Sequence, residues 1–213
     1  MNKVSPAFIS NLLIVILMFA MGYLYFNQLP DQIITHWNTA GEVDGTMSKL
    51  TTLILFPSIA LFFTLLFPLL RHIDPKNESY ILFKRAWGFM QVGIIGFLAY
   101  IYFITLYATL NPETSVIQFI VGGIGVLFII IGFTIKNIHQ NFFVGIRTPW
   151  TLSSEIVWNK THKLGGNLFA LAGIISFVDA FFMIRQVIVL LVAILTAVLL
   201  SVFYSYYLYR NLK

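Results

Sequence analysis

Two polar stretches of this sequence carry the side chains that are able to do chemistry. The first is residues 29–49, LPDQIITHWNTAGEVDGTMSK. Its acids and its histidine are Asp31, Glu42, Asp44 and His36. Such groups bind metals and carry protons, but the stretch contains no zinc motif such as HExxH. We therefore expect either a binding surface or a solvated loop whose Trp37 is anchored at the lipid headgroups.

The second stretch is residues 141–166, NFFVGIRTPWTLSSEIVWNKTHKLGG. It contains serines and a histidine, but no serine lies in a GxSxG elbow and no acid is evidently directed at His162. We therefore do not expect an enzyme. Two interpretations stay open. Arg147 could bind helix-end carbonyls or lipid phosphate with both Trp rings at the headgroup level, or the stretch could be a docking surface, because Trp and Arg dominate interface hot spots.

The composition shows which elements must position these stretches. The chain has 213 residues, of which 59% are hydrophobic and 10% charged, and its mean hydropathy is +0.87. Crossing a hydrocarbon layer of about 30 Å takes roughly 20 apolar residues, and continuous rather than alternating runs favour helices. Six runs qualify, near 7–26, 52–70, 87–110, 115–135, 164–184 and 187–208. The predicted fold is all-α, a polytopic membrane protein with six transmembrane helices and short loops.

The basic residues predict the orientation of these helices. Six spans place eleven of the 13 Lys and Arg residues on one side of the membrane. Those opposite are Lys49 and Arg185. By the positive-inside rule both termini and the second stretch are cytoplasmic, and the first stretch lies outside. The basic pI, about 9.5, thus indicates topology, and we expect membrane lipid as a partner and no direct contact with nucleic acid.

Local signals predict a few details of the two stretches. Pro30 should stop the first helix, the residues IITHWN favour a short strand, and Gly41 to Gly45 indicate a turn. Ser153 should cap a helix that either remains short or continues into the fifth span. In both cases Trp158 and His162, four residues apart, share one face.

Asp179 is a carboxylate within a predicted span, where acids often mark functional or paired sites. Arg185 lies on the wrong side of the same helix, and Lys49, at the outer start of the second span, is a plausible partner from another helix. The alternative is a neutral, hydrogen-bonded Asp179. Small residues at spacings of three to four predict close helix packing in spans four and five. They are Gly122, Gly125 and Gly132, and Gly166, Ala170 and Gly173.

The second stretch strongly resembles the signature of the SdpI family, bacterial membrane immunity proteins against a secreted sporulation-delaying toxin. The matching positions are Asn141, Gly145, Arg147, Thr148, Pro149, Trp150, Thr151, Leu152, Ser154, Glu155, Trp158, Thr161, His162 and Gly166. The first stretch is similar to the domain of unknown function that precedes this signature in full-length members. Its matching positions are Leu29, Pro30, His36, Gly41, Asp44 and Lys49. Ile34 and Lys163 stand where the family pattern has Pro and Arg.

The resemblance implies two regions, residues 1–75 with the outer loop and residues 76–213 with the signature. It implies a multi-pass protein of the bacterial cell membrane that protects its cell from a toxic peptide. From the residues themselves we expect no cofactor and no bound metal. The resemblance also implies, less directly, a cytoplasmic repressor protein as a partner. The outer residues expected to contact the toxin are Asp31, His36, Trp37, Asn38, Glu42, Asp44 and Lys49. A transporter of small solutes or ions that uses Asp179 remains the alternative.

Overall fold

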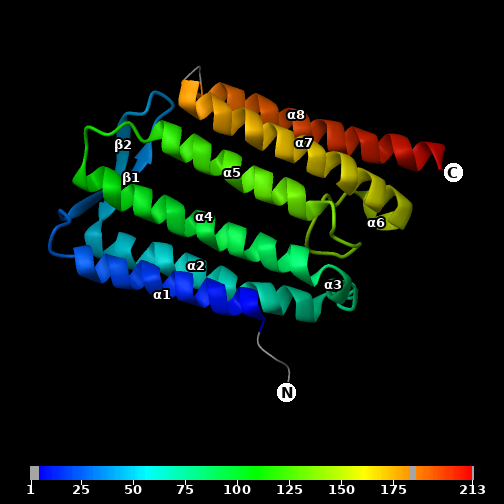
Figure 1. The fold of residues 1–213 in the computed structure, drawn as a ribbon, viewed down its shortest axis with the longest axis horizontal. Helices are drawn as coiled ribbons and strands as arrows, with labels where there is room; N and C mark the ends of the chain where they lie inside the picture. Colours follow the sequence, from blue (N-terminus) through cyan, green and yellow to red (C-terminus); the bar gives the residue numbers. More distant parts are fainter. Residues whose placement is uncertain (1–4, 183–185, 213) are drawn as a thin grey trace.

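The long helices run side by side and form the body of the molecule (Figure 1). The structure, a computed structural model, describes residues 5–182 and 186–212. Its long helices are α1 (Pro6–Tyr25), α2 (Lys49–Ile73), α4 (Lys84–Leu110), α5 (Ile117–Ile135), α7 (Glu155–Phe182) and α8 (Gln186–Asn211). Within the described residues, these six helices are long and apolar enough to cross a membrane. The predicted all-α polytopic membrane fold is confirmed.

The helices differ in how much of their apolar surface other helices cover. In the most apolar part of α7, 44% of the residues are buried inside the protein, against 17% in α8. Large side chains such as Leu13, Phe62 and Phe203 stay exposed on the outside of the bundle, where only lipid can cover them. Helix α7 is therefore central, and α8 lies at the periphery.

The closest helix crossing joins α5 to α7, as the small residues predict. A Cβ added at Gly125 would lie 2.8 Å from the Gly173 carbonyl oxygen, and one at Gly132 would collide with the Ala170 backbone. No real Cβ tolerates such distances, so these positions admit only glycine without moving a helix. Close backbone approach replaces the hydrophobic driving force that lipid does not provide.

Some predicted start and stop signals of the helices were wrong. Helix α1 ends at Tyr25, within one residue of the predicted limit, but Pro30 does not stop it, because a turn at residues 26–29 already closes on the Tyr25 carbonyl. The fifth span begins at Glu155 rather than near 164, so the helix that starts in the second stretch continues into the membrane. Ser153 caps nothing; it ends a separate short helix, α6 (Pro149–Ser153), and the Ser154 hydroxyl accepts the Val157 N–H at the start of α7.

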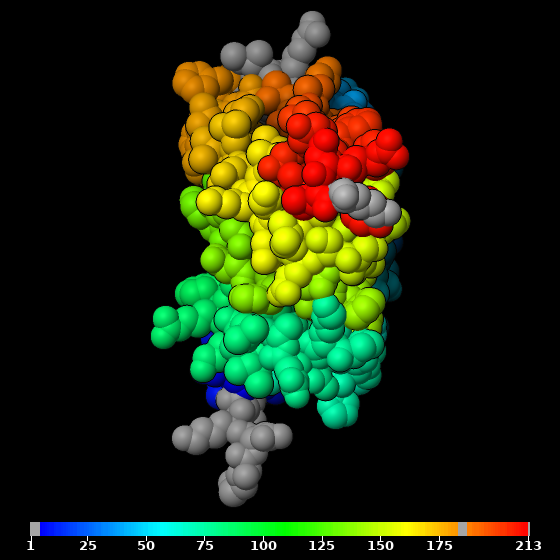
Figure 2. Space-filling view, turned by 90° about the vertical axis from the view of Figure 1, so that its right-hand side faces the viewer, coloured from blue at the N-terminus to red at the C-terminus, as the bar shows by residue number. Residues whose placement is uncertain are grey.

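The two ends of the bundle carry different structures (Figure 1). One, here the hairpin end, bears strands β1 (Gln32–Trp37) and β2 (Val43–Ser48), and its residue 111–116 loop joins α4 to α5. The other, the motif end, bears α3 (Ser79–Leu82), the residue 136–148 loop and α6. Figure 2 looks onto the motif end, where the chain around residue 75, residues 137–160 and the end of α8 share one face.

Candidate functional site

The motif end is organised by Asn141, whose side chain is completely buried. Its amide oxygen accepts the N–H groups of Phe143 and Val144, at 2.9 and 2.7 Å. Its amide nitrogen donates to the carbonyls of His139 and Val144, both at 2.9 Å. One side chain therefore closes the loop between α5 and α6 by satisfying four backbone groups, which an apolar residue could not do.

His162 and Trp158 form the second element of the motif end, stacked with ring centroids 4.0 Å apart. Both are fully buried. His162 Nε2 accepts the Ile146 N–H at 2.9 Å, and Nδ1 lies 2.8 Å from the Trp158 carbonyl oxygen. These bonds define a neutral ring protonated at Nδ1, so neither nitrogen is free for acid-base chemistry. The Trp158 indole N–H donates to the Ile138 carbonyl at 2.7 Å.

Gly145 is the position that allows this stack to form. Its φ is +122°, a conformation that other residues rarely adopt. A Cβ there would collide with His162 Nε2 and lie 3.1 Å from the Trp158 ring. The glycine of the signature is thus explained by a close approach of the loop to two side chains of α7.

The threonines of the signature build the short helix α6. Thr148 and Thr151 form a capping box in which each hydroxyl accepts the other's backbone N–H, at 3.2 and 2.9 Å. The Thr151 hydroxyl donates to the Ile146 carbonyl at 2.8 Å, and the Thr148 hydroxyl lies 3.1 Å from that of Ser205 in α8. These bonds attach the loop to the last helix.

Sequence reasoning missed the residues that connect this motif to the first half of the chain. Asp74, only 2% exposed, accepts hydrogen bonds from the Tyr80 hydroxyl at 3.1 Å and from the Phe142 N–H at 3.0 Å. Burial, followed by the adjacent Asp74 carboxylate, raises the pKa of Tyr80 well above its usual value, so the phenol stays protonated and donates. Lys76 donates to the Gln140 amide oxygen, and the Gln140 amide nitrogen donates to the Thr151 and Leu152 carbonyls.

The Asp74-Pro75 pair alone indicates only a helix breaker. No short spacing in the sequence signals a contact between Asp74 and residues 68 positions away. A buried carboxylate that accepts several hydrogen bonds is nevertheless costly to remove, so Asp74 belongs to the site.

Burial corrects one expectation for the second stretch. Trp158 is a core residue, so the two Trp rings do not both lie at the headgroup level. Trp150 is half-buried and packs on Tyr206, with ring centroids 5.0 Å apart. Arg147 is exposed and donates to the Phe142 carbonyl of its own loop at 2.7 Å, rather than to a helix end.

Half of the matching positions of the signature are therefore buried inside the protein. Asn141, Thr148, Thr151, Thr161 and His162 are buried, whereas Arg147, Pro149 and Glu155 remain at the surface. Within residues 5–182 and 186–212, no group of three or more His, Asp or Glu side chains is placed to hold a metal ion. The buried hydrogen bonds and ring contacts of the motif end hold α5, α7 and α8 together.

The hairpin end presents the opposite arrangement, with its polar side chains outward. Strands β1 and β2 pair antiparallel, with Ile34 opposite Thr46 and Trp37 opposite Val43. The register is irregular around His36, which lies opposite Gly45. The strand predicted from IITHWN is confirmed, and the glycine segment continues into its partner strand β2.

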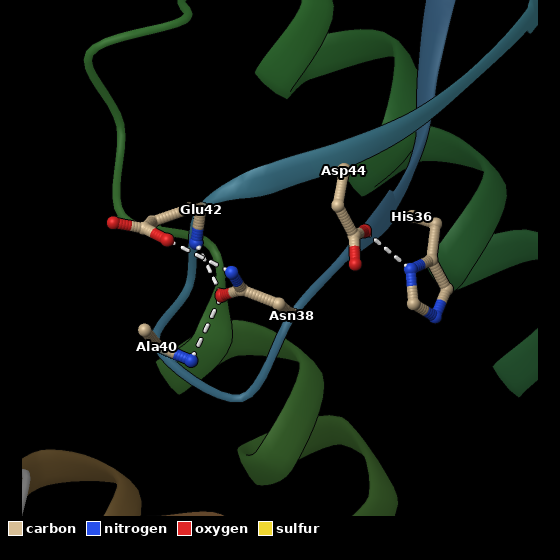
Figure 3. A network of polar contacts seen from close by, with 5 residues as sticks. All are labelled: His36, Asn38, Ala40, Glu42 and Asp44. Atoms are coloured by element: carbon tan, nitrogen blue, oxygen red, sulfur yellow. Dashed lines mark hydrogen bonds and ion pairs between the residues drawn. The ribbon is translucent and has the colours of Figure 1, made fainter.

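Figure 3 shows the polar contacts at the tip of the hairpin. The Asn38 amide oxygen accepts the N–H groups of Ala40 and Glu42, at 2.9 and 3.0 Å, and its amide nitrogen donates to the Glu42 carboxylate at 2.8 Å. His36 Nδ1 lies 2.5 Å from an Asp44 carboxylate oxygen, and their side chains are 72% and 43% exposed. The tip is therefore rigid in its backbone, yet it offers a histidine and two carboxylates to solvent.

Packing against the bundle fixes the base of the hairpin. Ile33 is fully buried in the core, and the Ile34 N–H donates to the Thr109 hydroxyl of α4 at 3.0 Å. Lys49 donates to the Leu29 carbonyl at 2.8 Å and lies 3.7 Å from Asp31. Of the residues expected at the outer surface, Asp31, His36, Glu42 and Asp44 are exposed, while Trp37, Asn38 and Lys49 are partly buried.

Asp179 is not paired with Lys49, which is engaged at the base of the hairpin, so that expectation was wrong. One carboxylate oxygen of Asp179 is buried and has no hydrogen-bond partner among the described residues. Arg185, the other basic residue weighed as its partner, lies outside the described residues.

Known protein families match both the hairpin region and the signature region of the chain. The model of the SdpI/YfhL protein family matches residues 137–205, and that of a domain of unknown function, DUF1648, matches residues 13–61. The immunity protein SdpI of Bacillus subtilis (strain 168) is 28% identical over 206 residues, which cover 96% of this chain and 97% of that protein. Residues 137–205 thus match the SdpI/YfhL family, and the similarity to SdpI extends over nearly the whole chain. No solved structure matches it.

The two departures from the pattern of the SdpI family have different structural meanings. Ile34 uses its backbone N–H to bind Thr109, and a proline at this position would have no such donor. Lys163 is exposed at the motif end and keeps the positive charge of the arginine that it replaces. This chain thus fastens its hairpin to α4 by a hydrogen bond that a proline would forbid.

Proposed function

We propose that this protein is an immunity protein that protects its own cell from a secreted toxic peptide at the membrane surface. The observation that supports this most is the match over nearly the full length of both chains to a protein named as an immunity protein. Both the hairpin and the signature lie within the matched length, so the comparison covers the whole architecture and not a shared helix pair.

The exposed face of the hairpin end is the surface that we assign to the toxin. Among the described residues, it carries four acids and one base. They are Asp31, Glu42, Asp44, Glu113 and Lys49. A net negative face outside the membrane attracts cationic peptides, and salt weakens this attraction. His36, Trp37 and Asn38 supply the hydrogen bonds and the aromatic surface with which a bound peptide is recognised.

We infer the orientation of the protein from its charge distribution. Of the Lys and Arg residues that the structure describes, nine lie at the motif end and only Lys49 at the hairpin end. Under the positive-inside rule the motif end is cytoplasmic and both termini lie there. A reporter fused to the C-terminus that is active only outside the cytoplasm would contradict this orientation.

We assign two roles to the motif end: it holds the two regions of the chain together, and it presents a surface to a cytoplasmic partner. Its buried hydrogen bonds join the region 1–75, through Asp74, to the region 76–213. The exposed Arg147 and Glu155 are the surface on which a cytoplasmic repressor could dock, and this partner is a separate, finer proposal. It predicts that an Arg147→Ala chain still protects cells but no longer retains the repressor in the membrane fraction.

The test of the main proposal is survival. The chain is expressed in a sensitive bacterium, which is then challenged with the secreted toxin peptide of the family, while binding of the peptide to the purified protein is measured in parallel. We expect protection together with binding. A chain that accumulates in the membrane but neither protects nor binds the peptide would refute the proposal. Ion or solute flux in vesicles that Asp179→Asn abolishes would support a transporter instead.

A further inference from the structure

A groove opens on the side of the bundle at the motif end, between the start of α1, the end of α2 and the start of α4. Its volume is about 1280 Å³. The side chains of Ala7, Phe8 and Trp87 contribute apolar walls. Trp87 is held in place by edge-to-face contacts with Phe67 and Tyr80, at 5.4 and 5.6 Å between ring centroids. The groove is thus rigid on one side.

The rim of this groove is basic. Arg71, His72, Lys84 and Arg85 line it, with Glu78 as its acid. All four basic side chains are exposed, and none forms an ion pair or a hydrogen bond with any residue in the parts of the chain that the structure describes. In a chain with few charges, three cations and a histidine beside a single acid that pairs with none of them in the described structure predict an anion as ligand.

A buried amide lies deeper in the same groove. Gln91 is only 6% exposed, and its side chain has no hydrogen-bond partner among residues 5–182 and 186–212. Seven residues of helix separate it from Lys84, which corresponds to about 10 Å toward the membrane interior. The Gln91 amide lines the groove and is not used by the described residues of the protein itself, so it is available to a ligand that has polar atoms at that depth.

We propose that this groove binds one anionic phospholipid of the adjacent leaflet. Its phosphate is held by Lys84, Arg85 and Arg71, and an ester carbonyl accepts a hydrogen bond from Gln91. The acyl chains continue along the apolar walls. A soluble anion would pair with the basic residues of the rim but would not reach Gln91. A phospholipid carries a charged phosphate, polar ester groups about one headgroup deeper, and apolar chains below them. Basic pockets between transmembrane helices recognise anionic headgroups in this manner.

The test uses the full-length chain purified in a non-ionic detergent and native mass spectrometry. Dioleoyl phosphatidylglycerol and dioleoyl phosphatidylcholine are compared, because they differ only in the headgroup. We expect one retained phosphatidylglycerol and no retained phosphatidylcholine. K84Q/R85Q should weaken retention about 30-fold, since each basic residue near an anionic lipid contributes about a factor of five. Gln91→Leu should weaken it by a smaller factor.

The matched control is K160Q/K163Q. It removes two exposed charges from the same end of the protein, outside the groove, and should leave retention unchanged. Equal retention of both lipids, or an equal loss in the control, would overturn the proposal, as would displacement of the lipid by inorganic phosphate. If K84Q/R85Q does not elute as a monodisperse protein, Arg71→Gln together with Gln91→Leu provides the same test. No toxin is present, so the outcome is independent of the proposed immunity.

Discussion

The hairpin end and the motif end are both rich in polar residues, but they use them in opposite ways. His36 and Asp44 have side chains that are 72% and 43% exposed, whereas Asn141 and His162 are completely buried. At the hairpin end the backbone is fixed and the side chains are available. At the motif end the polar side chains are engaged in the hydrogen bonds that fix the backbone.

The difference separates two kinds of functional residue. A buried polar side chain that satisfies several backbone groups cannot be replaced without leaving them unpaired. An exposed polar side chain can be replaced with little effect on stability, so the binding partner can determine which residue occupies that position. We therefore infer that the signature maintains the architecture, while the hairpin determines what the protein recognises.

The largest effect on stability is expected for Trp158→Ala. The substitution creates a cavity worth about 3–5 kcal/mol and leaves the Ile138 carbonyl and the His162 ring without their neighbour. The melting temperature in detergent and the amount of protein in the membrane should both fall sharply. Trp150→Ala is the matched control, since Trp150 is half-buried, and it should lower the melting temperature less. Equal losses would mean that burial does not distinguish the two tryptophans.

A smaller loss is expected for Asp74→Ala, which leaves the Phe142 N–H unpaired at about 1–3 kcal/mol. The Tyr80 hydroxyl loses its nearer acceptor but keeps Asn141 Oδ1 at 3.4 Å. Combining it with Tyr80→Phe in a double-mutant cycle should reveal a coupling of about 0.5–3 kcal/mol. Glu78→Ala, an exposed acid of the same loop, serves as the control and should have almost no effect. Additive losses for Asp74 and Tyr80 would show that the two regions are not joined there.

Ile34→Pro tests the attachment of the hairpin. It removes the N–H that binds Thr109, so we expect a loss of about 1 kcal/mol and faster hydrogen exchange in β1 and β2. The α5 to α7 crossing should keep its protection. Thr109→Val breaks the same bond from the other side, and the two substitutions together should be less than additive. Unchanged exchange in the hairpin would show that this bond does not hold it.

The sequence was sufficient for the parts of this structure that depend on composition and periodicity. Continuous apolar runs predicted the six spans, and the glycines around Gly125 and Gly173 predicted the tight crossing of α5 and α7. The spacing of four between Trp158 and His162 correctly placed them on one face, where they stack.

Long-range hydrogen bonds escaped prediction. Asp74 and Phe142 are 68 residues apart, and nothing in the local pattern connects them. The same reason explains why the headgroup interpretation of Trp158 was wrong: a Trp near the end of a span is typical of an interfacial anchor. Only the loop that folds over it, through Asn141 and Gly145, turns it into a core residue.

The most direct test of this division of roles is survival under toxin challenge of cells that carry His36→Ala, compared at equal accumulation with the wild-type chain. We predict an unchanged melting temperature, because the His36 side chain is largely exposed, together with a clear loss of protection. A His36→Ala protein that is stable and protects cells as well as the wild type, along with an Asp44→Asn protein that does the same, would contradict the assignment of recognition to the hairpin.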